Sequence, residues 1–143
     1  MKLREYETVS SFRRDFYVYE AAVNAIATGA SANDSIQIEA DSDFILQKLV
    51  QWTDNAGVQQ TAATRVIPNV TVQITDTGSG RQILNQPTPI GAIFGDGNLP
   101  FILPNPRLFM RNSTIQVAFT SFEVAATPDI FLGFVGYKIY NTR

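Results

Sequence analysis

Apolar and polar residues alternate with a period of two along much of this chain. In Val70–Thr75 (VTVQIT) apolar residues alternate with Thr and Gln, and Ser35–Ala40 (SIQIEA) repeats the pattern more briefly. Because successive side chains of a β-strand point to opposite faces, this alternation predicts strands with one buried face. Segments rich in Gly, Pro, Asn and Asp separate the runs and are typical of turns. The pattern therefore predicts an antiparallel all-β fold.

The last run, Asp129–Tyr140 (DIFLGFVGYKIY), is mostly apolar on both of the faces that a strand would have. Such a strand is covered on both sides, which predicts that it lies in the middle of a sheet. One cover is the opposite sheet, and the other is a loop, an N-terminal arm or another subunit. Gly133 and Gly136 within the run would let a backbone or an aromatic ring approach closely.

Two segments are ambiguous between strand and helix. Phe44–Thr53 (FILQKLVQWT) has apolar residues at helical spacing, and the preceding Asp43 could cap a helix. The turn-like Asp54–Gly57 directly afterwards favours a strand. Asp15–Ile26 combines aromatic residues that favour a strand with an Ala-rich end that favours a helix. We interpret both segments as strands.

We predict one β-sandwich domain at residues 15–143, preceded by an N-terminal arm at residues 1–14. About eight strands are predicted: Asp15–Ile26, Ser35–Ala40, Asp43–Thr53, Val70–Asp76, Arg81–Leu84, Arg107–Met110, Thr114–Val124 and Asp129–Tyr140. Eight antiparallel strands with long irregular connections favour a jelly-roll-like sandwich over an up-and-down barrel. A jelly roll needs connections that cross between its sheets, and the segment Asn85–Pro106, rich in Pro and Gly, can supply one.

Composition adds information about the surface. The 143 residues are enough for one domain with a sizeable core, and 45% of them are apolar while 17% are charged. A charged fraction below the typical quarter indicates surface covered by other subunits, with an apolar monomeric β-protein as the alternative. No signal peptide is visible, and the apolar-leaning run Ala21–Ala32 is too short and polar to span a membrane. We expect no membrane partner.

The charge distribution gives no support for specific nucleic-acid binding, since the net charge is −2. Four of the eleven basic residues nevertheless lie within the first fourteen positions, interleaved with acidic residues. These four are Lys2, Arg4, Arg13 and Arg14. They could reach an acidic partner, or they form an ordinary solvated terminus.

Little in the chain could run a reaction. Histidine and cysteine are absent, which excludes Ser-His-Asp and Cys-His triads, thiolate metal sites and disulfides. Glu39, Asp41 and Asp43 are the candidate carboxylates for hydrolysis or Ca²⁺ binding, but a role in forming a turn is the simpler interpretation. The Gly-rich Asp76–Arg81 lacks the ending of a phosphate-binding loop. We predict no catalytic residues, no cofactor and no metal.

Three segments of the second half resemble a group of small virion proteins from tailed bacteriophages. They are TDTGSGRQILNQPTPI, LPFILPNPRLFMRNSTIQVAFTSFE and IFLGFVGYKIY. In that group a Gly-Arg turn, a Pro-rich PxP-x-L-F segment, an N-S-T-I-x-V strand and a terminal F-x-G-Y-K-I-Y strand recur in the same order. The resemblance covers roughly Val70–Tyr140, about half of the chain. Its motifs are structural and identify no catalytic residues.

The resemblance implies a capsid cement or decoration protein with a jelly-roll-like fold, which would not be an enzyme. Such proteins are assembled in the host cytoplasm, lie on the outer capsid surface and bridge capsomers of the major capsid protein, commonly as homodimers or homotrimers. Tail, neck and fibre proteins of phages share the fold, so the position in the virion stays open. A receptor- or carbohydrate-binding module is the alternative of another class. Trp52 and the tyrosines would then stack on sugars, although aromatic residues of β-proteins more often belong to the core.

Two segments are predicted to contact partners. One is the arm with its continuation, Met1–Phe16, and the other is a Pro-stiffened loop, Pro100–Phe109, which would lose little entropy on docking. The candidate contact residues are Lys2, Arg4, Phe12, Arg13, Arg14, Phe16, Pro100, Phe101, Pro104, Pro106 and Arg107.

Overall fold

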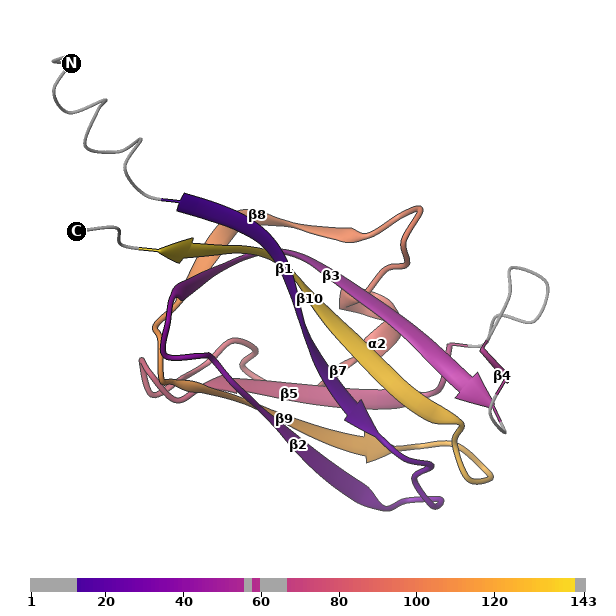
Figure 1. Cartoon of the computed structure of the whole chain (residues 1–143). Coiled ribbons are helices and arrows are strands. Elements are labelled where there is room, and N and C mark those ends of the chain that lie inside the picture. Colours follow the sequence, from indigo (N-terminus) through magenta and orange to yellow (C-terminus); the bar gives the residue numbers. More distant parts are fainter. Residues whose placement is uncertain (1–12, 56–57, 60–66, 141–143) are drawn as a thin grey trace, which may run out of the picture.

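The computed structural model describes residues 13–55, 58–59 and 67–140, and their secondary structure is almost entirely β. Two antiparallel sheets face each other, as Figure 1 shows. The first sheet contains β1 (Arg13–Val23), β3 (Asp43–Asn55), β4 (Val58–Gln59), β8 (Phe101–Phe109) and β10 (Asp129–Tyr140). The second contains β2 (Ser31–Gln37), β5 (Val70–Asp76), β6 (Arg81–Gln82), β7 (Thr88–Pro89) and β9 (Thr114–Ser121). The predicted all-β sandwich is confirmed.

Strand order shows how the chain passes between the sheets. In the first sheet the order is β1-β10-β3, and both β8 and β4 pair with β3. In the second sheet the order is β2-β9-β5, and both β6 and β7 pair with β5. The chain therefore changes sheet at most of its connections, and strands that are distant in sequence become neighbours.

The core lies between the sheets and follows from the alternation in the sequence. In β5 every second residue is buried, so that Val70, Val72 and Ile74 face the first sheet. Four phenylalanines from both sheets are completely buried: Phe44, Phe109, Phe119 and Phe134. Each buried side chain of this size stabilises the fold by about 1.5–3 kcal/mol. The aromatic content of the sequence thus serves largely to fill the space between the two sheets.

Each of the eight predicted strands overlaps a strand of the structure, although the bounds differ. The helical alternative for Phe44–Thr53 is wrong, because β3 pairs with β10 on one side and with β8 on the other. β2 begins at Ser31, four residues before the predicted start at Ser35, because its polar residues occupy an exposed edge strand of the second sheet.

The prediction that Pro100–Phe109 is a loop is wrong, since this segment forms the edge strand β8. The stretches Phe101–Ile102 and Arg107–Phe109 pair with β3, and the register shifts between them. Pro104 and Pro106 lie within that shift. Proline lacks the N–H that a ladder uses, so it is tolerated where the ladder of an edge strand is interrupted.

The first sheet also takes up the end of the predicted arm. β1 begins at Arg13, where Arg13 pairs with Tyr140 and Arg14 with Ile139. The Arg13 guanidinium carbon lies 4.2 Å from the centroid of the Tyr140 ring. Arg13 and Arg14 therefore belong to a strand, and not to the arm predicted for residues 1–14. The rest of that arm, with Lys2, Arg4 and Phe12, lies outside the described residues.

The prediction that the last strand is central is confirmed, because β10 lies between β1 and β3. A Cβ at Gly136 would overlap the carbonyl oxygen of Ile45, so glycine is needed for the close approach of β3. The inner side chains of β10, such as Leu132 and Phe134, are fully buried, whereas the outer ones are only half-buried. No strand or helix within the described ranges lies over this outer face.

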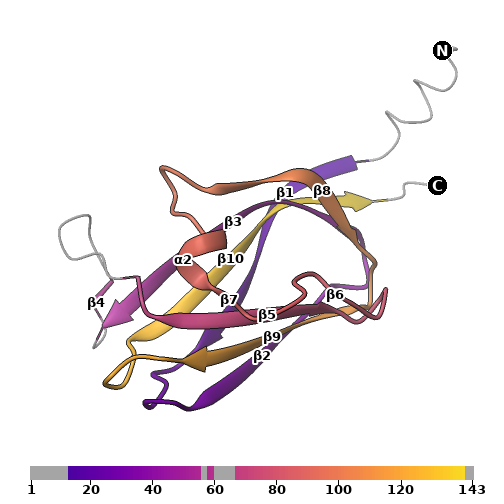
Figure 2. The same ribbon diagram turned by 180° about the vertical axis from the view of Figure 1, so that it is seen from behind.

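The predicted crossing connection within Asn85–Pro106 is confirmed. The chain leaves the second sheet at β7, forms the one-turn helix α2 (Ile90–Ile93) and joins the first sheet at β8. Gly95 anchors the crossing, because its N–H donates to the Leu49 carbonyl (3.1 Å) and its carbonyl accepts from the Gln51 N–H (2.8 Å). Figure 2 shows α2 between β5 and β8.

Candidate functional site

The outer face of the first sheet is assembled from rows of paired residues that cross its strands. Residues opposite each other in antiparallel strands point to the same face, so the register defines each row. One row is Phe16, Tyr137, Ile45 and Leu108, and the next is Val18, Val135, Lys48 and Ile102. Two shorter rows are Glu20, Gly133 and Val50, and Ala22, Phe131 and Trp52.

These rows form a largely apolar surface that is interrupted by the exposed Lys48 and bordered by the exposed Glu20, and we call its apolar part the outer-face patch. It consists of Phe16, Val18, Ile45, Val50, Trp52, Ile102, Leu108, Phe131, Val135 and Tyr137. Exposure is greatest at the two edges of the sheet, where Phe16 is 76% exposed and Ile102 64% exposed. Strand spacing and rise give the patch roughly 20 Å by 20 Å. A patch of about 400 Å² is comparable to the largest apolar patch of a typical monomer, which is often functional, so it marks a candidate contact surface.

The end of the patch near the β3–β4 turn has a fixed aromatic arrangement. The rings of Trp52 and Phe131 stack with centroids 5.6 Å apart and planes within 7° of parallel. A Cβ at Gly133 would come within 2.6 Å of Val50 Cγ2 and within 3.2 Å of the Trp52 ring. Glycine at this position lets both side chains lie flat over β10. The close approach predicted at Gly133 is therefore confirmed, and it keeps the patch flat.

The outer face of the second sheet is polar, in contrast to the patch. Its rows are Ser31, Thr120 and Thr71, then Asn33, Ala118 and Gln73, then Ser35, Gln116 and Thr75. A shallow hollow of about 380 Å³ lies over the second and third of these rows and over Gln82. A solvated sheet face is expected to be polar, and the second sheet follows that rule while the first does not. The two faces of this sandwich therefore differ in what they can contact.

The predicted contact residues are divided between this patch and other places. Arg14 and Phe16 lie on the outer face of β1, and the Arg14 guanidinium carbon is 5.4 Å from the Tyr137 ring centroid. Pro104 and Pro106 are exposed in the irregular part of β8, and Pro100 directly precedes it. β1 and β8 lie at opposite edges of the sheet, but the row from Phe16 to Leu108 joins them on one face.

Sequence reasoning missed most of the patch. Its middle is formed by Ile45, Val135 and Tyr137, which were assigned to strands without a contact role. The available signal was the apolar character of both faces of Asp129–Tyr140, for which a second cover was expected. The two predicted residues Phe101 and Arg107 lie on the inner side of β8 instead, although Phe101 is still 37% exposed. They line an apolar cleft of about 160 Å³ between the sheets, beside Leu46, Ile74 and Phe134.

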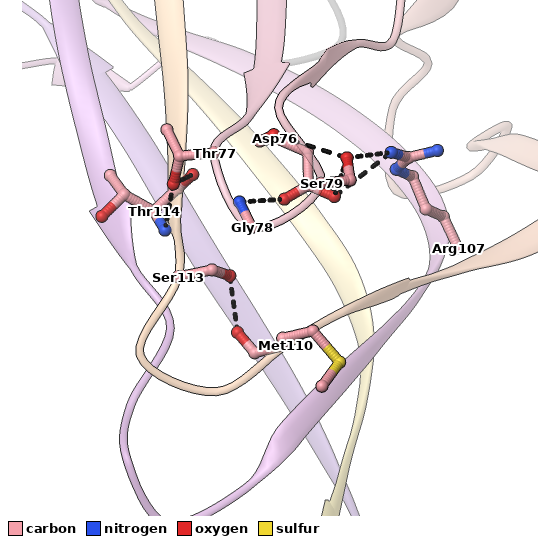
Figure 3. Close-up of polar contacts among 8 residues, drawn as sticks. All are labelled: Asp76, Thr77, Gly78, Ser79, Arg107, Met110, Ser113 and Thr114. Carbon is pink, nitrogen blue, oxygen red and sulfur yellow. Dashed lines mark hydrogen bonds and ion pairs between the residues drawn. The ribbon is translucent and has the colours of Figure 1, made fainter.

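Arg107 takes part in a polar cluster that joins the two sheets (Figure 3). Its Nη2 donates to Asp76 Oδ2 at 3.2 Å and to the Ser79 hydroxyl at 3.3 Å. Asp76 is 3% exposed at the end of β5, and its carboxylate also accepts from the Gly78 N–H (3.0 Å) and from the Ser79 hydroxyl (3.1 Å). The carboxylate thus accepts hydrogen bonds from Arg107, Gly78 and Ser79, which suits a structural role.

The same turn is tied to the start of β9. Thr77 Oγ1 donates to the Thr114 carbonyl (2.8 Å) and accepts from the Thr114 N–H (2.9 Å). The Ser113 hydroxyl donates to the carbonyl of Met110, which lies just after β8. Figure 3 shows these contacts beside and below the turn that carries Gly78, with the cluster of Asp76, Ser79 and Arg107 on its other side. The N–H groups of Thr77 and Gly78 and the Ser79 hydroxyl therefore bond to the protein itself, which does not favour phosphate binding at this turn.

A second charged cluster closes the end of the core near the β2–β3 turn. Lys138 is buried in β10, and its Nζ donates to Glu39 Oε2 at 2.9 Å and lies 3.5 Å from Asp41 Oδ1. The Tyr17 hydroxyl donates to the other oxygen of Glu39 (3.0 Å), and Lys138 Nζ lies 4.1 Å from the Tyr17 ring centroid. The hydrogen bond from Lys138, followed by that from Tyr17, lowers the pKa of Glu39.

The pKa of Lys138 moves in the opposite direction to that of a merely buried lysine. Burial alone lowers it, but the hydrogen bond to Glu39 and the nearby negative charges raise it above the ordinary value. The pKa of Tyr17 is raised by its hydrogen bond to Glu39, and burial raises the pKa of Tyr19. The cluster is therefore a charged ion pair at neutral pH, with a protonated lysine that cannot act as a base.

The candidate carboxylates of the sequence are occupied by these structural contacts. Glu39 and Asp41 pair with Lys138, and Asp43 Oδ1 accepts from the backbone N–H (2.9 Å) and the Nε (3.1 Å) of Arg111. Across the residues that the structure describes, no three acidic side chains are grouped as a metal site would require. No helix in the same residues has the length and apolar character that crossing a bilayer demands.

Comparisons with family models, with curated protein sequences and with solved structures found no match to this chain. The geometry of the outer-face patch is therefore the main observation that bears on function.

Proposed function

We propose that the chain is a structural protein of a phage virion, and specifically a capsid cement protein that docks on the head through the outer-face patch. The contrast between the two outer faces carries this proposal. A polar face such as that of the second sheet is well solvated by water. Covering the aromatic and aliphatic face of the first sheet lowers the free energy, because it removes apolar surface from water. Such a protein needs a complementary surface and no active site.

The order of the strands supports the same proposal. To compare strand orders, we count β6 and β7 as one strand, leave β4 aside and number the remaining eight strands from 1 to 8 along the chain. The order β1-β10-β3-β8 of the first sheet then becomes 1-8-3-6, and the order β2-β9-β5-β6/β7 of the second becomes 2-7-4-5. Crossing connections between two such sheets resemble those of a jelly roll, a fold that recurs in viral capsid domains. A fold alone does not assign a function, so this argument has less weight than the patch itself.

The size of the patch fits a protein that acts in many copies. A stable interface between two proteins buries about 800 Å² on each partner, which is roughly twice the patch. A single contact through the patch would be weak, but symmetry repeats it over every equivalent position of a shell. In this proposal the major capsid protein is the partner, and the outer surface of the head is the location.

Cosedimentation tests the proposal. The full chain is mixed with expanded and with unexpanded heads of the phage that encodes it, and the bound fraction is measured. We expect binding to expanded heads, strong loss of binding for the variant Phe16→Ser/Ile102→Ser, and unchanged binding for Val124→Ser. Val124 is 94% exposed but lies outside the patch, so this control removes an apolar side chain from elsewhere. Equal binding by the double variant would reject the patch as the docking surface.

The stacked pair Trp52 and Phe131 favours one second candidate, a carbohydrate-binding module. A flat aromatic ring on an exposed sheet face can stack on a sugar, and Trp52 presents such a ring. This candidate predicts that the native chain binds a glycan on an array and that Trp52→Ala loses this binding. Absence of glycan binding together with binding to heads would favour the cement protein.

A further inference from the structure

The free edge of β1 carries a row of backbone groups that no described strand pairs. β1 pairs on one side with β10, and the Ala22 N–H on the other side donates to Asp34 Oδ2 at 2.7 Å. In an antiparallel pair, N–H and C=O groups point alternately toward and away from the partner strand. The backbone groups of Glu20, Val18, Phe16 and Arg14 therefore point away from β10, in the same direction as those of Ala22.

We propose that β1 pairs along this edge with β1 of a second copy of the chain, antiparallel and with Tyr17 of both copies on the twofold axis. The two first sheets would then form one continuous sheet, and the outer-face patches of both copies would lie side by side on it. Open strand edges are templates for such pairing, and an interface that uses the same surface on both copies closes at a dimer.

The register around Tyr17 pairs the backbone N–H and C=O groups of β1 that point away from β10. Each copy places Arg14 opposite Glu20 of the other copy, and Phe16 opposite Val18 of the other copy. All four of these residues have outward-pointing backbone groups, so every pair can exchange two hydrogen bonds. The side chains match as well, because oppositely charged pairs flank two apolar pairs on the outer face. Arg14 and Glu20 are exposed on this edge, and Phe16 and Val18 are 76% and 38% exposed.

Other registers fit less well. A shift by two residues would place Arg14 opposite Val18 and would leave Glu20 without a charged partner. A shift by one residue would oppose inward and outward backbone groups and break the ladder. The Asp34 carboxylate already occupies the Ala22 N–H, so pairing ends just beyond Glu20, where the proposed register ends too. The charge order along β1 thus specifies one register.

This inference does not depend on the proposed function, since it concerns only how two copies associate. Size-exclusion chromatography with light scattering tests it on the full chain. We expect a dimer for the native chain and a dimer dissociation constant at least about tenfold higher for Arg14→Glu. The exchange Arg14→Glu/Glu20→Arg should restore the dimer. Arg14 and Glu20 of one copy are about 20 Å apart along the strand, so rescue by the exchange requires a contact between copies.

A matched control and a crosslink complete the test. Lys48→Glu makes the same charge reversal on the same sheet face but two strands away, and we expect it to keep the dimer. The chain has no cysteine, so Tyr17→Cys should give a disulfide dimer under mild oxidation while Val135→Cys, on the central strand, should not. Any of three results would overturn the proposal. They are a native chain that is a monomer or a trimer, an Arg14→Glu/Glu20→Arg variant that folds but does not dimerise, and a Tyr17→Cys variant that forms no disulfide dimer.

Discussion

Arg107 of β8 and Asp76 of β5 form an ion pair of 3.2 Å across the two sheets of the sandwich. The Asp76 side chain is 4% exposed and the Arg107 side chain 32% exposed, so the carboxylate depends on this partner more than the guanidinium does. The pair holds the edge strand β8 against the second sheet. Through β8 it also positions Leu108 and Ile102, which form one border of the outer-face patch.

Replacing Arg107 by alanine should therefore destabilise the fold. The change leaves a buried carboxylate without its cation, and we expect the free energy of unfolding to fall by about 2–4 kcal/mol. Chemical denaturation of Arg107→Ala measures this loss, with the exposed Arg81→Ala as the matched control. In the double variant Arg107→Ala/Asp76→Asn part of the loss should return, because the uncompensated charge is removed. A loss no greater than that of Arg81→Ala would contradict the structural role of the pair.

Stability should fall in acid because of Glu39. Its pKa in the folded chain lies below the ordinary value of 4.5, so folding favours the charged form. The contribution to stability is complete above that ordinary value and is lost as the pH falls through the lower, folded pKa. Thermal unfolding between pH 6 and pH 2.5 should therefore show a decline that is reduced in Glu39→Gln. Profiles of identical slope in the two proteins would count against the Glu39–Lys138 pair.

The same pair should resist alkali. The pKa of Lys138 in the folded chain lies above its ordinary value of 10.5, so its contribution is complete below that value and is lost only as the pH rises through the folded pKa. We expect no loss of stability from Lys138 between pH 7 and pH 10. Lys138→Met should flatten the acid decline as Glu39→Gln does, since it removes the donor that lowers the pKa of Glu39. Thermal unfolding from pH 2.5 to pH 10 measures both the acid decline and the resistance to alkali.

Two glycines of β10 should respond differently to alanine. At Gly136 a Cβ would meet the backbone carbonyl of Ile45, which cannot move without breaking the pairing of β10 with β3. At Gly133 it would meet the side chains of Val50 and Trp52, which can shift. We expect Gly136→Ala to cost more than about 2 kcal/mol and Gly133→Ala clearly less. Denaturation curves of equal midpoint for the two variants would show that the predicted difference in clash is absent.

Binding and stability should separate on the outer-face patch. Ile102→Ser removes a side chain that is 64% exposed on β8, away from the proposed dimer edge, so we expect the free energy of unfolding to change by no more than about 0.5 kcal/mol. Phe134→Ala, in the buried centre of the same sheet, should cost about 3–5 kcal/mol. Differential scanning calorimetry distinguishes the two. A large loss in Ile102→Ser would mean that the patch serves the fold of the isolated chain.

Much of the fold could be predicted from the sequence because it depends on local alternation. The period of two in Val70–Thr75 and the two apolar faces of Asp129–Tyr140 were enough to predict a sandwich with a central last strand. Only the end of β8 was predicted, as Arg107–Met110, because Pro104 and Pro106 before it are typical of a loop. The pairing with β3 shows that these prolines lie in an interruption of the ladder. Pairing between distant segments is not visible in local pattern.

The candidate site was less predictable for the same reason. The outer-face patch exists only when β1, β10, β3 and β8 are placed in register, and no single segment reveals it. Arg107 was predicted to contact a partner because it follows a Pro-rich stretch, yet it faces the core and pairs with Asp76. Phe16 was predicted as part of an arm and instead belongs to the patch through its pairing with Tyr137. Sequence indicated apolar surface but not where the surface lies.

The central proposal is that this chain coats a phage head. The most direct measurement is immunogold electron microscopy of purified virions of the phage proposed to encode it, with an antibody raised against the folded chain. We predict gold distributed over the outer surface of the head and absent from the tail, with labelling lost when the gene carries Phe16→Ser/Ile102→Ser. Virions without label, or label confined to the tail or its fibres, would contradict the claim.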